Sequence, residues 1–296
     1  MNASAPLVLQ ALLGDYPATH ALIHGGVSRP GIALDFAAVP RPSAAFKRVV
    51  RELAFDFSEL AIVTYLIARA FDKPLVLLPA VVLARFQHPF IVYAAARGTM
   101  SPRDLYGGRV GIRSYSVTTV AWIRGILSEL GVDSDCITWV TFEEPHVAEF
   151  VDPPNVARAR AGTSPVEMLI AGELDAAVLG EVTDDARLKP LFPDAEQVAR
   201  AWYQAHRALQ INHMVVVKSS LARNRPDIVR DLYGMLEESK RKAGLPDPAR
   251  LDTNPMGWDA NRRNLEVAID YVYRQRLIPR RFDVDELIVD TTRDLR

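Results

Sequence analysis

Short apolar runs alternate with longer segments of helical periodicity along the chain, and this alternation constrains the fold more than any other feature. Most of the runs are rich in β-branched or aromatic residues, as β-strands are. Strands that alternate with helices form a parallel or mixed sheet with helices on both faces, so the sequence predicts an α/β protein. The expected strands are Leu7–Leu13, Ile32–Val39, Leu75–Ala80, Phe90–Ala96, Arg109–Ile112, Ile137–Val140, Ala176–Leu179 and His213–Val217.

The helices are predicted from their start signals and their apolar period. In residues 163–167 a hydroxyl residue, Pro165 and an early glutamate stand together, as at many helix starts, and Gly172 is expected to end that helix. The other expected helices are Ala44–Leu53, Glu59–Ala70, Thr118–Leu130, Pro226–Lys242 and Trp258–Gln275.

The middle of the chain has its own strand and helix alternation, bracketed by two apolar strands. We therefore predict two lobes, with residues 1–95 and 212–296 in lobe 1 and residues 96–211 in lobe 2. The chain would then cross the lobe boundary twice, and a small carboxylate-bearing molecule is expected in the cleft between the lobes. A single continuous doubly wound domain is the alternative.

Composition restricts the partners of this chain. Its 35 Lys and Arg residues balance 36 Asp and Glu residues, so no overall field favours nucleic acid or an anionic membrane. The single cysteine, Cys136, excludes an internal disulfide and a cluster of several zinc-bound thiolates, and it fits a reducing cytoplasm. The Leu7–Leu13 run is too short for a signal-peptide core, and Leu75–Ala84 ends before the roughly 18 apolar residues of a membrane span. We expect a soluble, cytoplasmic protein.

The segment from Arg109 to Gly125 reads as a strand, a polar turn and a helix. Free N–H groups at a helix start, with hydroxyls beside them, form a cradle for a carboxylate or phosphate. Ordinary helix capping by the same hydroxyls is the alternative. Arg124 and Trp122 follow on this helix, and each is a candidate to point inward, with a surface position as the alternative for the arginine. The polar residues of the turn are Ser114, Tyr115, Ser116, Thr118 and Thr119.

Two histidines stand at strand ends, where ligands bind in open α/β sheets. His88 and Arg85 lie between two apolar strands, and an imidazole there can donate a proton or a hydrogen bond near neutral pH. A turn-fixing role before a proline is the alternative for His88. His213 opens an apolar strand and is a cleft candidate, with a hydrogen-bonded core histidine as the alternative.

The stretch Asp56–Glu59 is interpreted as the end of a strand and the start of a helix. Asp56 or Ser58 is expected to cap that helix, and Glu59 is expected to face either the cleft or the helix dipole. The other histidines are interpreted as lacking a metal-ligand spacing, and no metal is assigned. They are His20, His24, His146 and His206. Phosphate-loop, dinucleotide and serine-elbow motifs are absent from the sequence.

Several stretches together resemble the 4,5-dihydroxyphthalate decarboxylase family, a branch of the type II periplasmic-binding-protein superfamily. The W-x-R-G-I-L motif at 122–127 and the paired histidines are more specific than the others. The resemblance extends nearly from end to end. The matching stretches are residues 14–16, 55–60, 86–88, 104–111, 122–127, 172–176, 212–214, 254–257 and 273–277.

The resemblance implies a two-lobed fold and a loss of CO₂ from a hydroxylated aromatic dicarboxylate without metal or cofactor. His88 and His213 are then the expected acid or phenol-polarising residues, with His88 first. Arg124 and the helix start at Ser116–Thr119 are expected to hold a carboxylate, with Tyr115 and Trp122 nearby. Arg85 is expected to assist, and Glu59 to accept a ring hydroxyl.

The chain departs from the family pattern at two places. The family pattern R-x-F-R-H is A-R-F-Q-H at residues 84–88, and P-I-M-H is Q-I-N-H at residues 210–213. Both changes touch the expected anion-binding wall. The resemblance therefore identifies the family more firmly than it identifies the substrate. A solute-binding protein that does no chemistry is the alternative function. A ligand-sensing regulatory module is a further alternative, but the sequence has no helix-turn-helix or basic stretch that would read DNA. Residues 271–288 are expected to form either a subunit interface of a homo-oligomer or a packing surface within the chain.

Overall fold

The computed structural model describes residues 5–296, which divide into two compact units. Unit 1 comprises the chain up to Arg85 together with Ile211–Ile269 and Arg280–Arg296, and unit 2 comprises Phe86–Gln210 and Asp270–Pro279. These ranges differ from the expected lobes at residues 86–95 and 270–279, and also at Ile211, which lies in unit 1. The first segment contains a strand that pairs in the sheet of unit 2, and the second contacts residues of unit 2.

Unit 1 is built on a five-stranded mixed sheet in the order β2-β1-β3-β11-β4. Strand β1 runs parallel to β2 and β3, whereas β11 runs antiparallel to β3 and β4. Most residues of the three central strands are buried, because helices cover the sheet. The strands are β1 Leu7–Leu12, β2 Ile32–Phe36, β3 Phe57–Ala61, β4 Leu75–Ala84 and β11 Ile211–Lys218.

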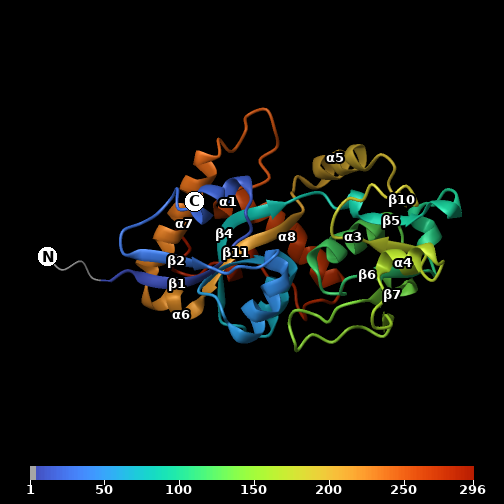
Figure 1. The fold of residues 1–296 in the computed structure, drawn as a ribbon, viewed down its shortest axis with the longest axis horizontal. Coiled ribbons are helices and arrows are strands. Elements are labelled where there is room, and N and C mark those ends of the chain that lie inside the picture. The colour runs from blue at the N-terminus through green and yellow to red at the C-terminus, as the bar shows by residue number, and fades with distance from the viewer. Residues whose placement is uncertain (1–4) are drawn as a thin grey trace. The chain divides into compact units, whose positions relative to one another are not determined.

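The helices of unit 1 bury an apolar face against this sheet. Leu9 of β1 and Val215 of β11 belong to the same hydrophobic cluster as Leu232 of helix α7, which Figure 1 shows in orange beside the sheet. The expected helix at 44–53 is instead a 3₁₀ turn, Pro42–Ala45, followed by a π turn, Arg48–Glu52. The α-helices are α1 Pro17–Ile23, α2 Ile62–Ala70, α6 Ser219–Asn224, α7 Pro226–Lys242 and α8 Trp258–Arg274, of which the part from Asp270 on belongs to unit 2.

Unit 2 contains a six-stranded mixed sheet in the order β10-β5-β9-β6-β7-β8. Its core includes Val92, Val140, Leu169 and Ala177. Strands β8 and β10 and helix α5 were not among the expected elements. The elements of this unit are β5 Ile91–Ala94, β6 Arg109–Ile112, β7 Thr138–Thr141, β8 Val156–Arg158, β9 Ala176–Val178, β10 Leu188–Pro190, α3 Thr118–Glu129, α4 Pro165–Ile170 and α5 Ala195–His206.

The two mixed sheets with flanking helices confirm the predicted α/β class. The predicted helix start at 56–59 was wrong, because Glu59 lies within β3 and helix α2 begins only at Ile62. The Ser58 hydroxyl donates to the backbone carbonyl of Glu59, and the Asp56 carboxylate accepts the Gln10 N–H. The Asp56 carboxylate therefore joins β1 to the residue before β3, whereas the Ser58 hydrogen bond stays within β3, and neither side chain caps a helix.

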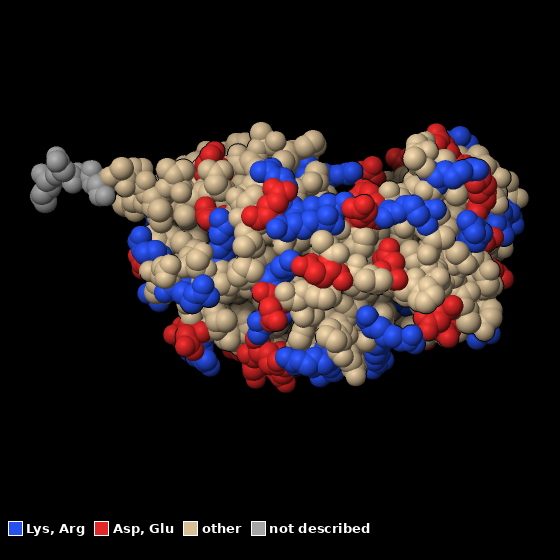
Figure 2. Space-filling view, turned by 90° about the horizontal axis from the view of Figure 1, so that it is seen from below, with Lys and Arg blue, Asp and Glu red and all other residues tan. Residues whose placement is uncertain are grey.

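Lys, Arg, Asp and Glu side chains are interspersed on the face that Figure 2 shows, in keeping with the balanced composition. In residues 5–296, no helix has the length and apolarity that a bilayer crossing requires. The apolar side chains of residues 271–288 include Leu277, Ile278, Phe282 and Leu287, and these are buried within the single chain.

Candidate active site

A buried carboxylate and a histidine face each other on neighbouring strands of unit 1. Glu59 of β3 is paired with Val215 of β11, so His213, two residues before Val215, is its diagonal neighbour on the same face of the sheet. Glu59 Oε1 lies 2.8 Å from His213 Nδ1, and the Glu59 residue is fully buried. The pairing of β3 with β11 thus places an imidazole against a carboxylate that water does not reach.

Strand β11 is irregular where it carries His213. Its register against β4 shifts between Ile211 and Val215, on either side of His213. Such irregularities turn side chains away from the regular alternation of a strand and are common beside active sites. The edge of the Phe46 ring packs against the imidazole with 5.0 Å between ring centroids, and 15% of the His213 side chain remains exposed.

The loop after β1 holds the Glu59 carboxylate from the other side. Gly14 donates its backbone N–H to Glu59 Oε2, and the Tyr16 hydroxyl lies 3.0 Å from Oε1. Burial and the Glu59 charge together raise the pKa of Tyr16, so its hydroxyl stays protonated and donates. The guanidinium of Arg85, at the end of β4, opposes this shift.

This arrangement fixes the tautomer of His213. A carboxylate only accepts hydrogen bonds, so Nδ1 carries a proton and donates it to Glu59. The second ring nitrogen, Nε2, is then the atom available for proton exchange with a bound molecule. The pair therefore has the arrangement of an oriented general acid or base.

His88 lies in unit 2, in the 3₁₀ turn His88–Phe90, and is fully buried. Its ring packs edge-on against Phe192, and neither ring nitrogen has a hydrogen-bond partner among the described residues. Burial lowers the pKa of His88 to about 4, so the imidazole is neutral at neutral pH. Buried polar atoms without partners are uncommon in proteins and mark a candidate ligand contact.

Arg124 of α3 is also fully buried, although arginines on helices are usually solvated. Its guanidinium stacks 3.7 Å from the centroid of the Tyr115 ring. Nη1 donates to the Tyr115 carbonyl and Nε donates to Gln275 Oε1, both at 2.8 Å. Burial lowers the pKa of Arg124 to about 10, which still leaves a cation at neutral pH, and Nη2 has no partner among residues 5–296.

Helix α3 begins without a side-chain cap, because its N-cap residue is Val117. Ser116 and Thr118 are buried beside this start and Thr119 is half-buried. Ser114 is buried as well, and its hydroxyl has no partner among the described residues. The N-cap therefore has no hydroxyl of its own, although the turn is rich in hydroxyls.

Trp122 does not join Arg124, because its ring packs against Trp202 and Tyr271 in an aromatic cluster. The structure thus brings the expected site residues together in two places: Glu59 with His213 in unit 1, and Arg124 with Tyr115 in unit 2. Gly14, Tyr16, Phe46 and Gln275 complete these groups. Gly14, Tyr16 and Gln275 belong to stretches that match the family, and this was the available signal.

Solved structures define the class of this fold. The chain has a TM-score of 0.58 and 17% identity to the alkanesulfonate-binding protein SsuA from Xanthomonas axonopodis pv. citri, covering 97% of this chain and 99% of that one. The aliphatic sulphonate binding protein SsuA from Escherichia coli gives a TM-score of 0.58 at 16% identity, over 97% and 92% of the two chains. The protein therefore has a periplasmic-binding-protein-like fold, as expected.

Sequence relatives narrow this class to a family. A 4,5-dihydroxyphthalate decarboxylase from Comamonas testosteroni is 30% identical over 252 residues, which cover 80% of this chain and 76% of the relative. A protein of the same name from Pseudomonas putida is 28% identical over 69% of this chain and 86% of its own length. No protein-family model matches the chain. The chain belongs to the 4,5-dihydroxyphthalate decarboxylase family, which confirms the resemblance.

Proposed function

We propose that this protein is a carboxy-lyase that removes CO₂ from a hydroxylated aromatic carboxylate of the phthalate type, such as 4,5-dihydroxyphthalate, with protocatechuate as the product. The observation that carries the proposal is the buried Glu59–His213 pair, which orients one imidazole for proton transfer. Its relatives named 4,5-dihydroxyphthalate decarboxylase support the same reaction.

The reaction needs a proton and no oxidant or reductant. A ring hydroxyl ortho or para to the leaving carboxylate donates electron density to the carbon that bears that carboxylate. That carbon takes a proton and the ring loses its aromaticity. The carbon–carbon bond then breaks, its electron pair returns to the ring, and CO₂ leaves. A positioned acid or base assists such proton transfers by roughly 10²–10⁴-fold.

We assign proton transfer to His213. Glu59 holds Nδ1, and Nε2 is the atom that exchanges a proton with the substrate. Tyr16 and Gly14 are positioning groups, because they act on Glu59. Glu59 is fully buried and already accepts from Gly14, Tyr16 and His213, so we assign that carboxylate to orienting His213 and not to a ring hydroxyl.

His88 was the first expectation for the acid, and the proposal gives it another role. With a pKa of about 4, its imidazole is neutral and is a poor proton donor to carbon at neutral pH. A neutral imidazole with two unpartnered nitrogens is suited to hydrogen-bond a substrate hydroxyl or carboxylate. We propose that contact for His88.

The start of α3 is the proposed carboxylate-binding element of unit 2. Its backbone N–H groups and the hydroxyls of Ser116, Thr118 and Thr119 offer donors to an anion. Arg124 adds a buried positive charge and holds the Tyr115 carbonyl, which fixes the turn before the helix. In the proposal Arg85 supplies a second cation for the substrate. Trp122 supports helix α3 through its packing against Trp202 and Tyr271.

The test is to incubate the protein with 4,5-dihydroxyphthalate and with phthalate as a control that lacks the activating hydroxyls. The proposal predicts CO₂ release and loss of substrate absorbance for the hydroxylated compound only. A solute-binding protein is the second candidate, and the two SsuA structures favour it through their fold. Saturable binding of both compounds without CO₂ release would support that second candidate.

The proposal places this reaction in the cytoplasm, which fits the free thiol of Cys136. Activity that fractionates with the periplasm would contradict this location. Oligomeric state is a separate part of the proposal, because residues 271–288 were expected to form either a subunit interface of a homo-oligomer or a packing surface within the chain. Light scattering of the purified protein measures it.

A further inference from the structure

Two histidines of helix α1 stand on one face of that helix. His20 lies in the last turn of Pro17–Ile23, and His24 is the residue that caps its C-terminus. Residues four apart are neighbours on a helix surface, and the two rings lie 4.3 Å apart, centroid to centroid. The pair is the H-x-x-x-H spacing of helical metal sites. The sequence interpretation that these histidines lack a ligand spacing was wrong, because the spacing is present.

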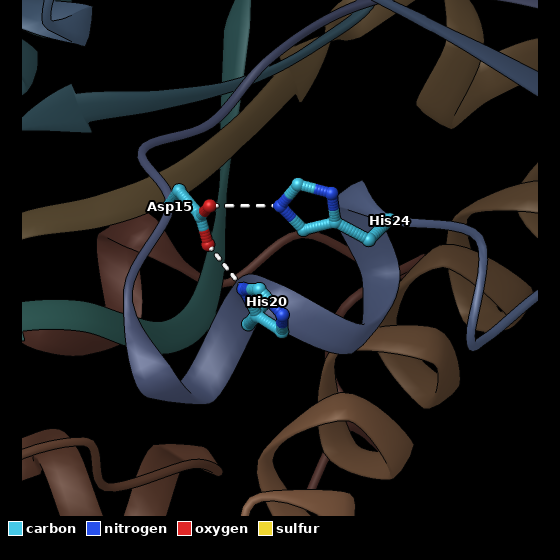
Figure 3. Close-up of side chains that lie close together, drawn as sticks. All are labelled: Asp15, His20 and His24. Carbon is cyan, nitrogen blue, oxygen red and sulfur yellow. Dashed lines mark hydrogen bonds and ion pairs between the residues drawn. The ribbon is translucent and has the colours of Figure 1, made fainter.

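Asp15 completes a cluster with these two imidazoles. One carboxylate oxygen lies 2.8 Å from His20 Nδ1 and the other lies 2.8 Å from His24 Nε2. Figure 3 shows the carboxylate aimed at both rings. One ligand atom from each residue lies within 4.8 Å of the other two, and all three residues are exposed.

The backbone that carries Asp15 is held on both sides. The neighbouring Gly14 N–H and Tyr16 hydroxyl both donate to Glu59, and the Thr19 hydroxyl donates to the Gly14 carbonyl. Helix α1 is in turn fixed to α7, because the Leu22 N–H donates to the Ser239 hydroxyl. The ligand atoms therefore converge without a rearrangement of the chain, which lowers the cost of binding.

We propose that Asp15, His20 and His24 form a surface site for a divalent transition metal of the zinc class. Two imidazole nitrogens and one carboxylate oxygen suit zinc, cobalt, nickel and copper ions better than magnesium or calcium, which prefer oxygen ligands alone. Three protein ligands leave a fourth position of a tetrahedral ion open to water. The site is separate from the proposed proton-transfer atom of His213 and does not depend on the proposed decarboxylation.

The alternative is a pair of hydrogen bonds that only closes the end of α1. Histidines near a helix C-terminus also interact favourably with its partial negative charge. A metal site differs from this alternative in one respect, because all three side chains must contribute to the affinity for the same ion.

The experiment uses the full-length chain without a histidine tag, treated with chelator and then titrated with zinc chloride in a calorimeter. The variants are Asp15→Asn, His20→Ala, His24→Ala and the double histidine variant. His206→Gln is the matched control, because His206 also contacts a carboxylate, that of Glu129, outside this cluster. Unfolding curves without metal show whether each variant is folded.

The wild-type chain and the His206→Gln control are expected to bind one zinc ion at this site. Each single variant should lose affinity by roughly tenfold or more, since even groups that only support a ligand contribute that much. The double variant should lose the site, and cobalt bound to the wild type should give the visible absorption of a four-coordinate ion. No zinc binding by the wild type, or equal binding by the folded double variant, would overturn the proposal.

Discussion

Glu59 and His213 lie on adjacent antiparallel strands, and the 2.8 Å contact between Oε1 and Nδ1 joins residues 154 positions apart in the chain. The carboxylate is buried and accepts hydrogen bonds from Gly14, Tyr16 and His213. A buried charge is tolerated when it is satisfied in this way. The imidazole is thus oriented by a group that cannot exchange partners with water.

Replacement of Glu59 by glutamine tests the orientation of His213. The amide keeps the size of the side chain but loses the charge and brings N–H donors into a site that needs acceptors. We expect kcat to fall by on the order of 10²-fold and the free energy of unfolding to fall by roughly 1–3 kcal/mol. Steady-state kinetics and urea unfolding measure the two effects.

Ser58→Ala is the matched control for this variant. Ser58 is also buried in β3, but successive residues of a strand face opposite sides of the sheet. Loss of its one hydrogen bond should cost about 1 kcal/mol of stability and leave kcat near that of the wild type. A Glu59→Gln variant with normal kcat would argue against the positioning role.

The buried His88 should make stability depend on pH. Its pKa falls from 6.5 in the unfolded chain to about 4 in the folded protein, so the unfolded state binds more protons between these values. Above pH 6.5 His88 is neutral in both states, and its lowered pKa costs no stability. The free energy of unfolding then falls as the pH falls from 6.5 toward 4. The two pKa values imply a loss of roughly 3 kcal/mol over that window.

Replacement of His88 by phenylalanine should remove this contribution, because the new side chain does not titrate. The urea midpoint of the variant is expected to change less than that of the wild type between pH 6.5 and 4. Parallel pH dependences for the two proteins would show that His88 does not have the lowered pKa.

Arg124→Met should destabilise unit 2 and weaken substrate binding. The substitution leaves the Tyr115 carbonyl and the partly buried Gln275 side-chain oxygen without their donor, and a buried acceptor without a partner, as the Tyr115 carbonyl would be, costs about 1–3 kcal/mol. Arg124→Lys keeps the charge but not the fork that reaches both acceptors. We expect the lysine variant to lie between wild type and the methionine variant in stability and in KM. Equal stability of all three proteins would contradict this account.

Gly125→Ala tests the packing of α3 against Tyr271. Alanine in a helix usually adds up to about 1 kcal/mol over glycine. At position 125 the added Cβ would lie 2.1 Å from the Tyr271 ring, and overpacking of this kind costs about 1–3 kcal/mol. The clash should win and lower the melting temperature.

Gly234→Ala in α7 is the control for that helix substitution. The added Cβ would meet only the Arg29 guanidinium, at 3.8 Å, so the usual gain of up to about 1 kcal/mol is expected. A rise in melting temperature for both variants would show that Tyr271 moves aside without cost.

Local patterns predicted the elements whose signals lie within a few residues. Helix α7 runs over the predicted Pro226–Lys242, because a proline at its start and an apolar stripe define it, and strand β6 runs over the predicted Arg109–Ile112. Strand β3 was predicted to end too early, with a helix from Glu59, because Ser58 and Glu59 interrupt its apolar pattern. The reason is tertiary, since the Glu59 carboxylate is satisfied by groups from β11 and from the loop after β1.

The residue types of the candidate site could be predicted from the sequence, but their spatial arrangement could be predicted only in part. His213 and Glu59 were named from their positions near strand ends, but their pairing depends on the order of strands in the sheet. The burial of Arg124 against Tyr115 and Gln275 likewise requires a contact with a segment about 150 positions away. By contrast, the spacing of His20 and His24 was local and was overlooked.

The most direct test of the account is a single-turnover measurement of CO₂ release from 4,5-dihydroxyphthalate by the wild type and by His213→Gln, with binding of the same compound measured in parallel. The account predicts rapid CO₂ release by the wild type and retained binding with release slowed by roughly 10²-fold or more in the variant. Release by His213→Gln at the wild-type rate would contradict the central role of the Glu59–His213 pair.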